Sequence, residues 1–170
     1  RQKNQQMLMY ILKAIEAKNP SKDFCLISVG RGHTQKDVEQ LASKLGVDGK
    51  VRFLGQRTDV PKLLNAMDMF FLPSLFEGFP IVAIEAQTAG LPLVIADTIS
   101  KEVELTNLVH WLPIDKGAEV WAEKYYQIAH TKVNRVQYAP IVERKGFDAR
   151  HSAQILQDLY VKNIRRNENA

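Results

Sequence analysis

Two glutamates, Glu77 and Glu85, carry most of the chemistry that this chain can offer. Glu77 lies in a loop, and Glu85 lies about five residues inside the helix expected to follow, on the order of 8 Å further along its axis at ~1.5 Å per residue. Carboxylates this far apart cannot share one proton. Each can instead accept hydrogen bonds from adjacent hydroxyls, so we expect Glu85 to hold a ribose and Glu77 a hexose of one diphosphate-linked ligand.

The start of that helix predicts an anion site between the two acids. Gly78 precedes the helix, Pro80 fits its first turn and Gly90 marks its end, as these residue types commonly do. The first backbone N–H groups of a helix have no intrahelical partner, and with the helix dipole they attract phosphate. The donors that we expect to be open belong to Phe79, Ile81 and Val82, whereas Pro80 has none.

Each acid also has an ordinary interpretation. Glu85 could be a surface residue of the helix, and Glu77 could simply complement the helix dipole. Glu85, however, stands between Ile84 and Ala86 in a helix that is apolar almost all round, where a carboxylate is costly without a polar partner. The sequence therefore favours a nucleotide sugar as the ligand.

Alternating helical and strand-like patterns must position these residues. Short apolar runs predict strands at 24–29, 51–54, 69–72 and 93–96, and other patterns predict helices at 4–18, 35–45, 59–67, 81–89, 119–130 and 149–164, with a turn or short helix at 140–145. This order predicts an α/β fold, an open doubly wound parallel sheet with a helical C-terminal part. Ligands of such sheets bind beyond the carboxyl ends of the strands.

The first apolar run, 24–29, is typical of a strand covered on both faces. It contains the chain's one cysteine, Cys25, which we expect to be a buried and inert packing residue. A single cysteine excludes a disulfide within the chain and favours a reducing compartment.

Composition indicates one domain. The 170 residues, 45% of them hydrophobic, suffice for a single core. The net charge of +4 indicates mild attraction for phosphates and does not suggest a nucleic-acid partner. No apolar run approaches the ~20 residues that cross a bilayer, and the histidines lack metal-ligand spacing.

The stretch EGFPIVAIEA, from Glu77 to Ala86, has E-x7-E spacing and resembles the retaining glycosyltransferases of family 4, in the donor-binding C-terminal half of their GT-B fold. Its surroundings also match, with Val51-Arg52-Phe53-Leu54-Gly55 before it and Gly90-Leu91-Pro92 after it. Among these enzymes the likeness is greatest to those that build capsular or extracellular polysaccharide.

This resemblance implies transfer of a sugar, with retention, from a UDP- or GDP-linked donor to a glycan or lipid-linked acceptor, without a metal ion. Lys3 would contact the diphosphate, and Glu77 would orient the donor sugar. The other donor-binding residues would be Gly78, Phe79, Pro80, Ile81, Val82 and Glu85, with Gly55, Gln56 and Arg57 as the base-facing loop. The resemblance also implies a cytoplasmic enzyme, peripheral at the inner face of the plasma membrane.

The chain departs from the family pattern in three places. The strand and Gly-Arg that precede Gln2-Lys3-Asn4 in the family are absent, and so is the N-terminal acceptor-binding domain. Arg31 stands where the family often carries an acid. We therefore expect a fragment of a full-length enzyme, one that binds a donor weakly and performs no transfer.

Two other functions fit parts of the sequence. A nucleotide-sugar epimerase would share the architecture, but it needs acid and base groups around the sugar, and the stretch supplies only Glu77 clearly. A non-catalytic nucleotide-binding module is the second alternative. Gly30-Arg31-Gly32 resembles part of a dinucleotide fingerprint but lacks the third glycine.

Overall fold

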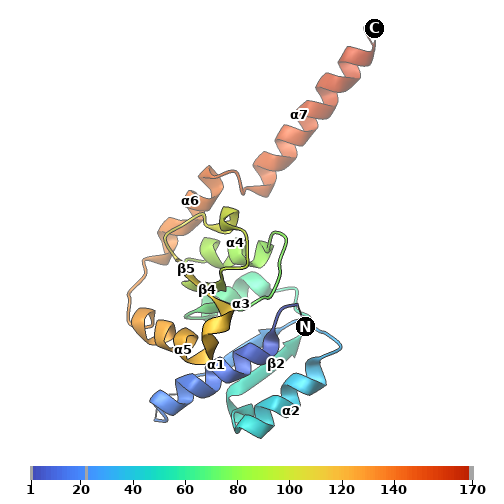
Figure 1. Cartoon of the computed structure of the whole chain (residues 1–170). Helices are drawn as coiled ribbons and strands as arrows, with labels where there is room; N and C mark the ends of the chain where they lie inside the picture. The colour runs from blue at the N-terminus through green and yellow to red at the C-terminus, as the bar shows by residue number, and fades with distance from the viewer. Residues whose placement is uncertain (1, 22, 169–170) are drawn as a thin grey trace.

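The computed structural model describes residues 2–21 and 23–168, which alternate between helices and strands (Figure 1). The helices are α1 (Gln5–Lys18), α2 (Gln35–Leu45), α3 (Val60–Ala66), α4 (Ile81–Thr88), α5 (Gly117–Ile128), α6 (Tyr138–Arg144) and α7 (Ala149–Glu168). The strands are β1 (Leu26–Val29), β2 (Val51–Gly55), β3 (Phe70–Leu72), β4 (Leu93–Ala96) and β5 (Val109–Leu112). Single 3-10 turns lie at Asp48–Lys50, Lys101–Val103, Ile114–Lys116 and Arg135–Gln137.

All strand pairs are parallel, which confirms the predicted α/β class with helices at the C-terminal end. The strands form two groups, β1-β2 and β3-β4-β5, and not one continuous sheet. Strand β5 was not predicted, because its four residues include His110 and give neither an apolar run nor a clear alternation. It adds a further parallel strand beside β4.

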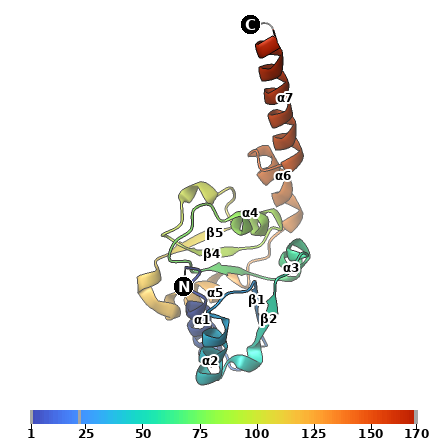
Figure 2. The same cartoon turned by 90° about the vertical axis from the view of Figure 1, so that its right-hand side faces the viewer.

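Strand β4 forms the centre of the main core. All four of its residues are buried, with α4 on one side and α5 on the other (Figure 2). Trp121 of α5 is fully buried and donates its indole N–H to the Pro113 carbonyl. A smaller core lies where α1 and α2 cover β2, with Met9, Val38 and Val51 among its buried residues.

Strand β1 differs from its predicted environment. The strand begins at Leu26, its four residues are only half-buried, and Cys25 just before it is exposed. The prediction of a buried Cys25 is therefore wrong. The physical reason is that β1 pairs with β2 along one edge and has no strand partner along the other within residues 2–21 and 23–168.

A buried glutamine fixes helix α4 in place. The Gln87 side chain donates to the carbonyls of Ala83 and Val103, and its Oε1 accepts from the backbone N–H groups of Leu105 and Thr106, each at 2.9 Å, and from the Thr106 hydroxyl. A buried amide with every group satisfied holds its neighbours in one arrangement. Gln87 thus ties α4 to the segment that joins β4 to β5.

Helix α7 projects from the rest of the molecule (Figure 1). Large apolar side chains along it are exposed: Ile155, Leu156, Leu159, Tyr160 and Val161. Within the described part of the chain, no helix combines the length and apolarity that a membrane crossing requires.

We expect Gln87→Met to lower the free energy of unfolding by about 2–4 kcal/mol, because it leaves buried backbone N–H groups of Leu105 and Thr106 without acceptors. Urea denaturation followed by circular dichroism measures the loss. Gln154→Met is the matched control, since Gln154 makes its hydrogen bond to Asp158 on the exposed surface of α7. Equal stability of the two variants would contradict the anchoring role.

Candidate functional site

The loop that leaves β3 enters α4 with its backbone amides open. Pro80 caps the helix in an extended conformation and is buried. The first hydrogen bond of the helix runs from the Ala83 N–H to the Pro80 carbonyl, at 2.9 Å. The N–H groups of Ile81 and Val82 precede that bond, so these two backbone donors have no partner within the helix.

Glu77 is held by two donors before α4 begins. Its Oε1 accepts from the Lys3 ammonium at 3.1 Å and from the Ser74 hydroxyl at 2.8 Å. The Ser74 side chain is fully buried, and its carbonyl accepts from the Thr98 hydroxyl at 2.9 Å. The Glu77 side chain is 10% exposed and that of Lys3 is 60% exposed, so the carboxylate is fixed while its cationic partner remains accessible.

The segment before α1 is attached to the same loop. The Gln2 carbonyl accepts from the Leu75 N–H at 2.9 Å, and the Gln2 side-chain amide donates to the Phe76 carbonyl at 3.0 Å. These two bonds hold the N-terminal segment against the loop, so that Lys3 reaches Glu77, 74 residues later in the sequence. Sequence reasoning missed the roles of Ser74 and Gln2, since a serine three residues before an acid was the only local signal.

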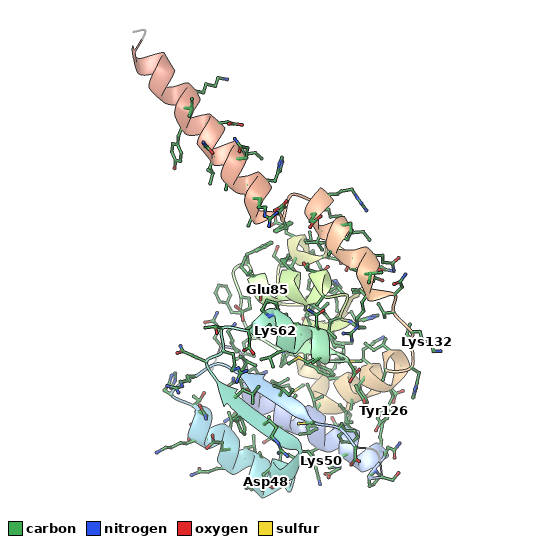
Figure 3. All side chains as sticks on the ribbon, turned by 180° about the vertical axis from the view of Figure 1, so that it is seen from behind. Asp48, Lys50, Lys62, Glu85, Tyr126 and Lys132 are labelled. Carbon is green, nitrogen blue, oxygen red and sulfur yellow. The ribbon has the colours of Figure 1, made fainter. Side chains whose placement is uncertain are left out.

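A cavity of about 900 Å³ lies beside this loop. Lys3, together with Val82 and Glu85 on α4, is among the residues that line it. Glu77 does not line the cavity and is joined to it through Lys3. Figure 3 shows Glu85 on α4, on the side where α3 with Lys62 packs. The structure therefore brings Lys3, Val82 and Glu85 into one cavity, with Glu77 at its edge.

The other predicted residues around the start of α4 are largely exposed. A side chain on Gly78 would meet open space, and Ile81 is exposed. Phe79 turns its ring against that of Phe147, with the centroids 5.8 Å apart and the planes parallel within 3°. The start of α4 thus exposes the backbone at Gly78 and the apolar side chains of Phe79 and Ile81.

The loop after β2 lies outside this cavity. Gly55 ends the strand, Gln56 and Arg57 follow it, and the Gly55 carbonyl accepts from the Gly30 N–H at 2.7 Å. Arg57 pairs with both carboxylate oxygens of Asp59, each at 2.8 Å, which holds the pKa of Asp59 below its usual range. Asp59 therefore occupies the cap position of α3 without capping it through its side chain.

The described residues contain no group of three or more His, Cys, Asp or Glu side chains arranged to hold a metal ion. His110 lies in β5, where burial and the nearby Lys124 lower the pKa of its imidazole. The groups that could hold an anion here are the Lys3 ammonium and the open N–H groups at the start of α4.

Proteins with related sequences are glycosyltransferases. The chain is 30% identical over 163 residues to the putative glycosyltransferase EpsF of Bacillus subtilis. The aligned region covers 94% of this chain and 42% of EpsF. It is 34% identical over 137 residues to the lipopolysaccharide glucosyltransferase WaaG of Escherichia coli. That alignment covers 79% of this chain and 34% of WaaG. The chain thus spans less than half the length of these curated relatives.

Solved structures show the same fold. The crystal structure of WaaG superposes with a TM-score of 0.72 at 25% identity, covering 89% of this chain and 41% of that one. The Anabaena protein Alr3699/HepE in complex with UDP-glucose superposes with a TM-score of 0.71 at 26% identity, covering 94% and 46%. Residues 1–130 match the family described as Glycosyl transferases group 1. The predicted resemblance is confirmed, and the chain belongs to the group 1 glycosyltransferases, as the C-terminal half of their GT-B fold.

Proposed function

We propose that the chain is the donor-binding half of a retaining glycosyltransferase that takes a sugar from a nucleoside-diphosphate donor. The observation that carries this proposal is the position of Lys3, whose ammonium bonds Glu77 while its side chain lines the cavity that contains Glu85. Lys3 thus links Glu77 to the cavity that Glu85 lines. This is where the diphosphate of a donor would lie.

Each group then has a distinct task. The N–H groups of Ile81 and Val82 and the dipole of α4 receive the diphosphate, as helix N-termini do in general. Glu85 accepts hydrogen bonds from the ribose hydroxyls, and Glu77 orients the hexose. When the sugar leaves, negative charge grows on the diphosphate, and Lys3 with the amides stabilises that charge without a metal ion.

Donor binding requires the Lys3–Glu77 pair to rearrange. The Lys3 side chain is 60% exposed, so its ammonium can turn towards phosphate oxygens at little cost in desolvation. Ser74 continues to donate to the Glu77 carboxylate from its buried position. The carboxylate thus keeps its place while the face released by Lys3 becomes available to sugar hydroxyls.

The relatives indicate which donor to test first. HepE was crystallised with UDP-glucose, and WaaG is described as a lipopolysaccharide glucosyltransferase, so a UDP-hexose is our first choice and a GDP-sugar the second. We place the base near Gly55 and Gln56, because Arg57 is already paired with Asp59. The acceptor would be a glycan or lipid-linked saccharide of a cell-surface polysaccharide, reached at the cytoplasmic face of the membrane with the N-terminal domain of the full-length enzyme.

We expect Glu85→Ala to weaken binding of both UDP and UDP-glucose by about tenfold or more, because hydrogen bonds to a charged group contribute ~1.5–3 kcal/mol. Glu77→Ala should weaken binding of UDP-glucose by a similar factor and should not weaken binding of UDP, since Glu77 is assigned to the sugar and its removal frees the Lys3 ammonium. Isothermal titration calorimetry measures both. Glu143→Ala on the exposed surface of α6 is the control. If both site variants bind UDP-glucose as the parent does, a non-catalytic module becomes the better description.

We propose further that one more parallel strand belongs between β1 and β3. The two strand groups turn unpaired edges towards the same cavity, which is lined by all of β1 and all of β3. Strand β3 is wholly apolar and β1 is apolar except for Ser28, close to the pattern of strands buried in a sheet, yet β1 is half-buried throughout and β3 is half-buried at Phe70 and Phe71. Apolar side chains of α1 and α3, such as Leu12 and Leu64, complete the lining.

The register of this strand follows from a bond already present. The Gln2 carbonyl pairs with the Leu75 N–H just beyond β3, so residues preceding Gln2 would continue along the edge of β3 in parallel. At ~3.3 Å per residue, about five residues are enough to run beside β3 and Pro73. The strand would end at Lys3 and lead directly into α1, which is the usual β–α connection. We therefore assign it to the segment before Arg1 in a longer protein.

The reactivity of Cys25 tests whether a strand fills the space between β1 and β3, because Cys25 is exposed and lines the cavity there. We expect an N-terminal extension of five alternating valine and isoleucine residues before Arg1 to slow alkylation of Cys25 by about tenfold or more and to raise the free energy of unfolding, since the added strand buries both edges. The rate of reaction with a chromogenic disulfide measures the first effect, and urea denaturation measures the second.

The matched control is an extension of the same length with proline at alternate positions, because proline cannot donate to a strand ladder. Equal Cys25 reactivity in the two extended chains would refute the strand assignment. Protection that depends on protein concentration would show instead that a second copy occupies the gap.

A further inference from the structure

Helix α6 runs antiparallel to α4 and brings Phe147 to the loop between β3 and α4, residues 73–80, which we call the donor loop. Two contacts fix this arrangement, one at each end of α4. At the C-terminal end, Gly90 packs so closely against Arg135, just before α6, that a Cβ would lie 2.6 Å from the Arg135 Cα. At the N-terminal end, Phe79 stacks on Phe147, just after α6. The Val142 side chain is buried along α6 between these points.

The position of Phe147 is set by the end of α6. The Gly146 N–H donates to the Glu143 carbonyl at 2.9 Å, the Phe147 N–H donates to the Val142 carbonyl at 3.4 Å, and Gly146 has a φ of +89°. These bonds and the left-handed glycine form the Schellman termination of a helix. Asp148 then accepts from the Arg150 N–H at the start of α7. Phe147 therefore lies in a short, hydrogen-bonded connection between the end of α6 and the start of α7.

The second half of the donor loop has few other restraints. Its first half is held by Gln2, Ser74 and Lys3. After Glu77, Gly78 has open space around it, and the ring of Phe79 makes its one aromatic contact within residues 2–21 and 23–162 with Phe147. The backbone that leads into the open amides of α4 thus depends on this stacked pair for its orientation.

We propose that Phe147 is a positioning residue for the donor loop. Its ring holds Phe79, and through Phe79 it orients Gly78 and the first amides of α4 towards the diphosphate and sugar of the donor. The nucleoside end of the donor, assigned to Glu85, does not depend on it. This inference rests on the proposed function, and it adds that the α6–α7 junction determines how well the sugar-phosphate end is bound.

The test compares Phe147→Ala with Phe147→Tyr, which keeps the ring. Phe147→Ala should bind UDP-glucose roughly threefold to tenfold more weakly, the loss typical of one aromatic pair, and should bind UMP within twofold of the parent. Phe147→Tyr should restore UDP-glucose binding. Saturation-transfer NMR and calorimetric titration measure these affinities. Tyr160→Ala, which removes an exposed aromatic ring from α7, is the matched control.

Amide hydrogen exchange without ligand gives a second, independent measurement. In Phe147→Ala, the Ala83 amide, which donates to the Pro80 carbonyl at the start of α4, should exchange about threefold to tenfold faster, because the aromatic pair that restrained this helix start is gone. Unchanged exchange, or UMP binding that falls as far as UDP-glucose binding, would overturn the positioning role. If the parent binds neither nucleotide and exchange still accelerates, the proposed function fails while the positioning of the loop by Phe147 stands.

Discussion

The hydrogen bonds of Gln87 are the constraint on which the candidate site depends. They join α4 to the segment after β4 with a fully satisfied buried amide, so the helix cannot shift along the sheet without leaving buried groups unpaired. Three of the features assigned to the donor are fixed to that helix or to the loop before it: the open amides, Glu85, and Glu77 with its Ser74 hydrogen-bond donor. A rigid support of this kind suits a site whose groups must keep fixed separations.

Lys3 differs from these features, because it lies in the N-terminal segment before α1. Its approach depends on the two hydrogen bonds of Gln2 with Leu75 and Phe76, and thus on main-chain pairing and not on the core. The cation is consequently the more adjustable partner of its ion pair. A fixed carboxylate and an adjustable cation suit a site in which the ligand carries both hydroxyls and phosphates.

Sequence patterns predicted the elements whose boundaries depend on local chemistry. Helix α2 has the predicted bounds, and Gly46 ends it in the left-handed conformation. Features that depend on tertiary context were missed or wrong: β5, the exposure of Cys25, the Arg57–Asp59 pair and the Phe79–Phe147 stack. At the site, the spacing of Glu77 and Glu85 was visible in the chain, whereas Lys3 was found only through the family resemblance, since no local pattern links residues so distant in sequence.

The Lys3–Glu77 pair also bears on which anions can occupy the resting site. The ammonium is already neutralised by a carboxylate, so an arriving ion must exchange with Glu77 and not merely add to a free positive charge. Orthophosphate offers no hydroxyl-rich ring to satisfy the carboxylate that it displaces, and the exchange brings it little net gain. A ligand that joins phosphates to a polyol satisfies both released groups at once. Under the proposed function, the pair therefore favours a ligand that carries both phosphates and a polyol over a small inorganic anion.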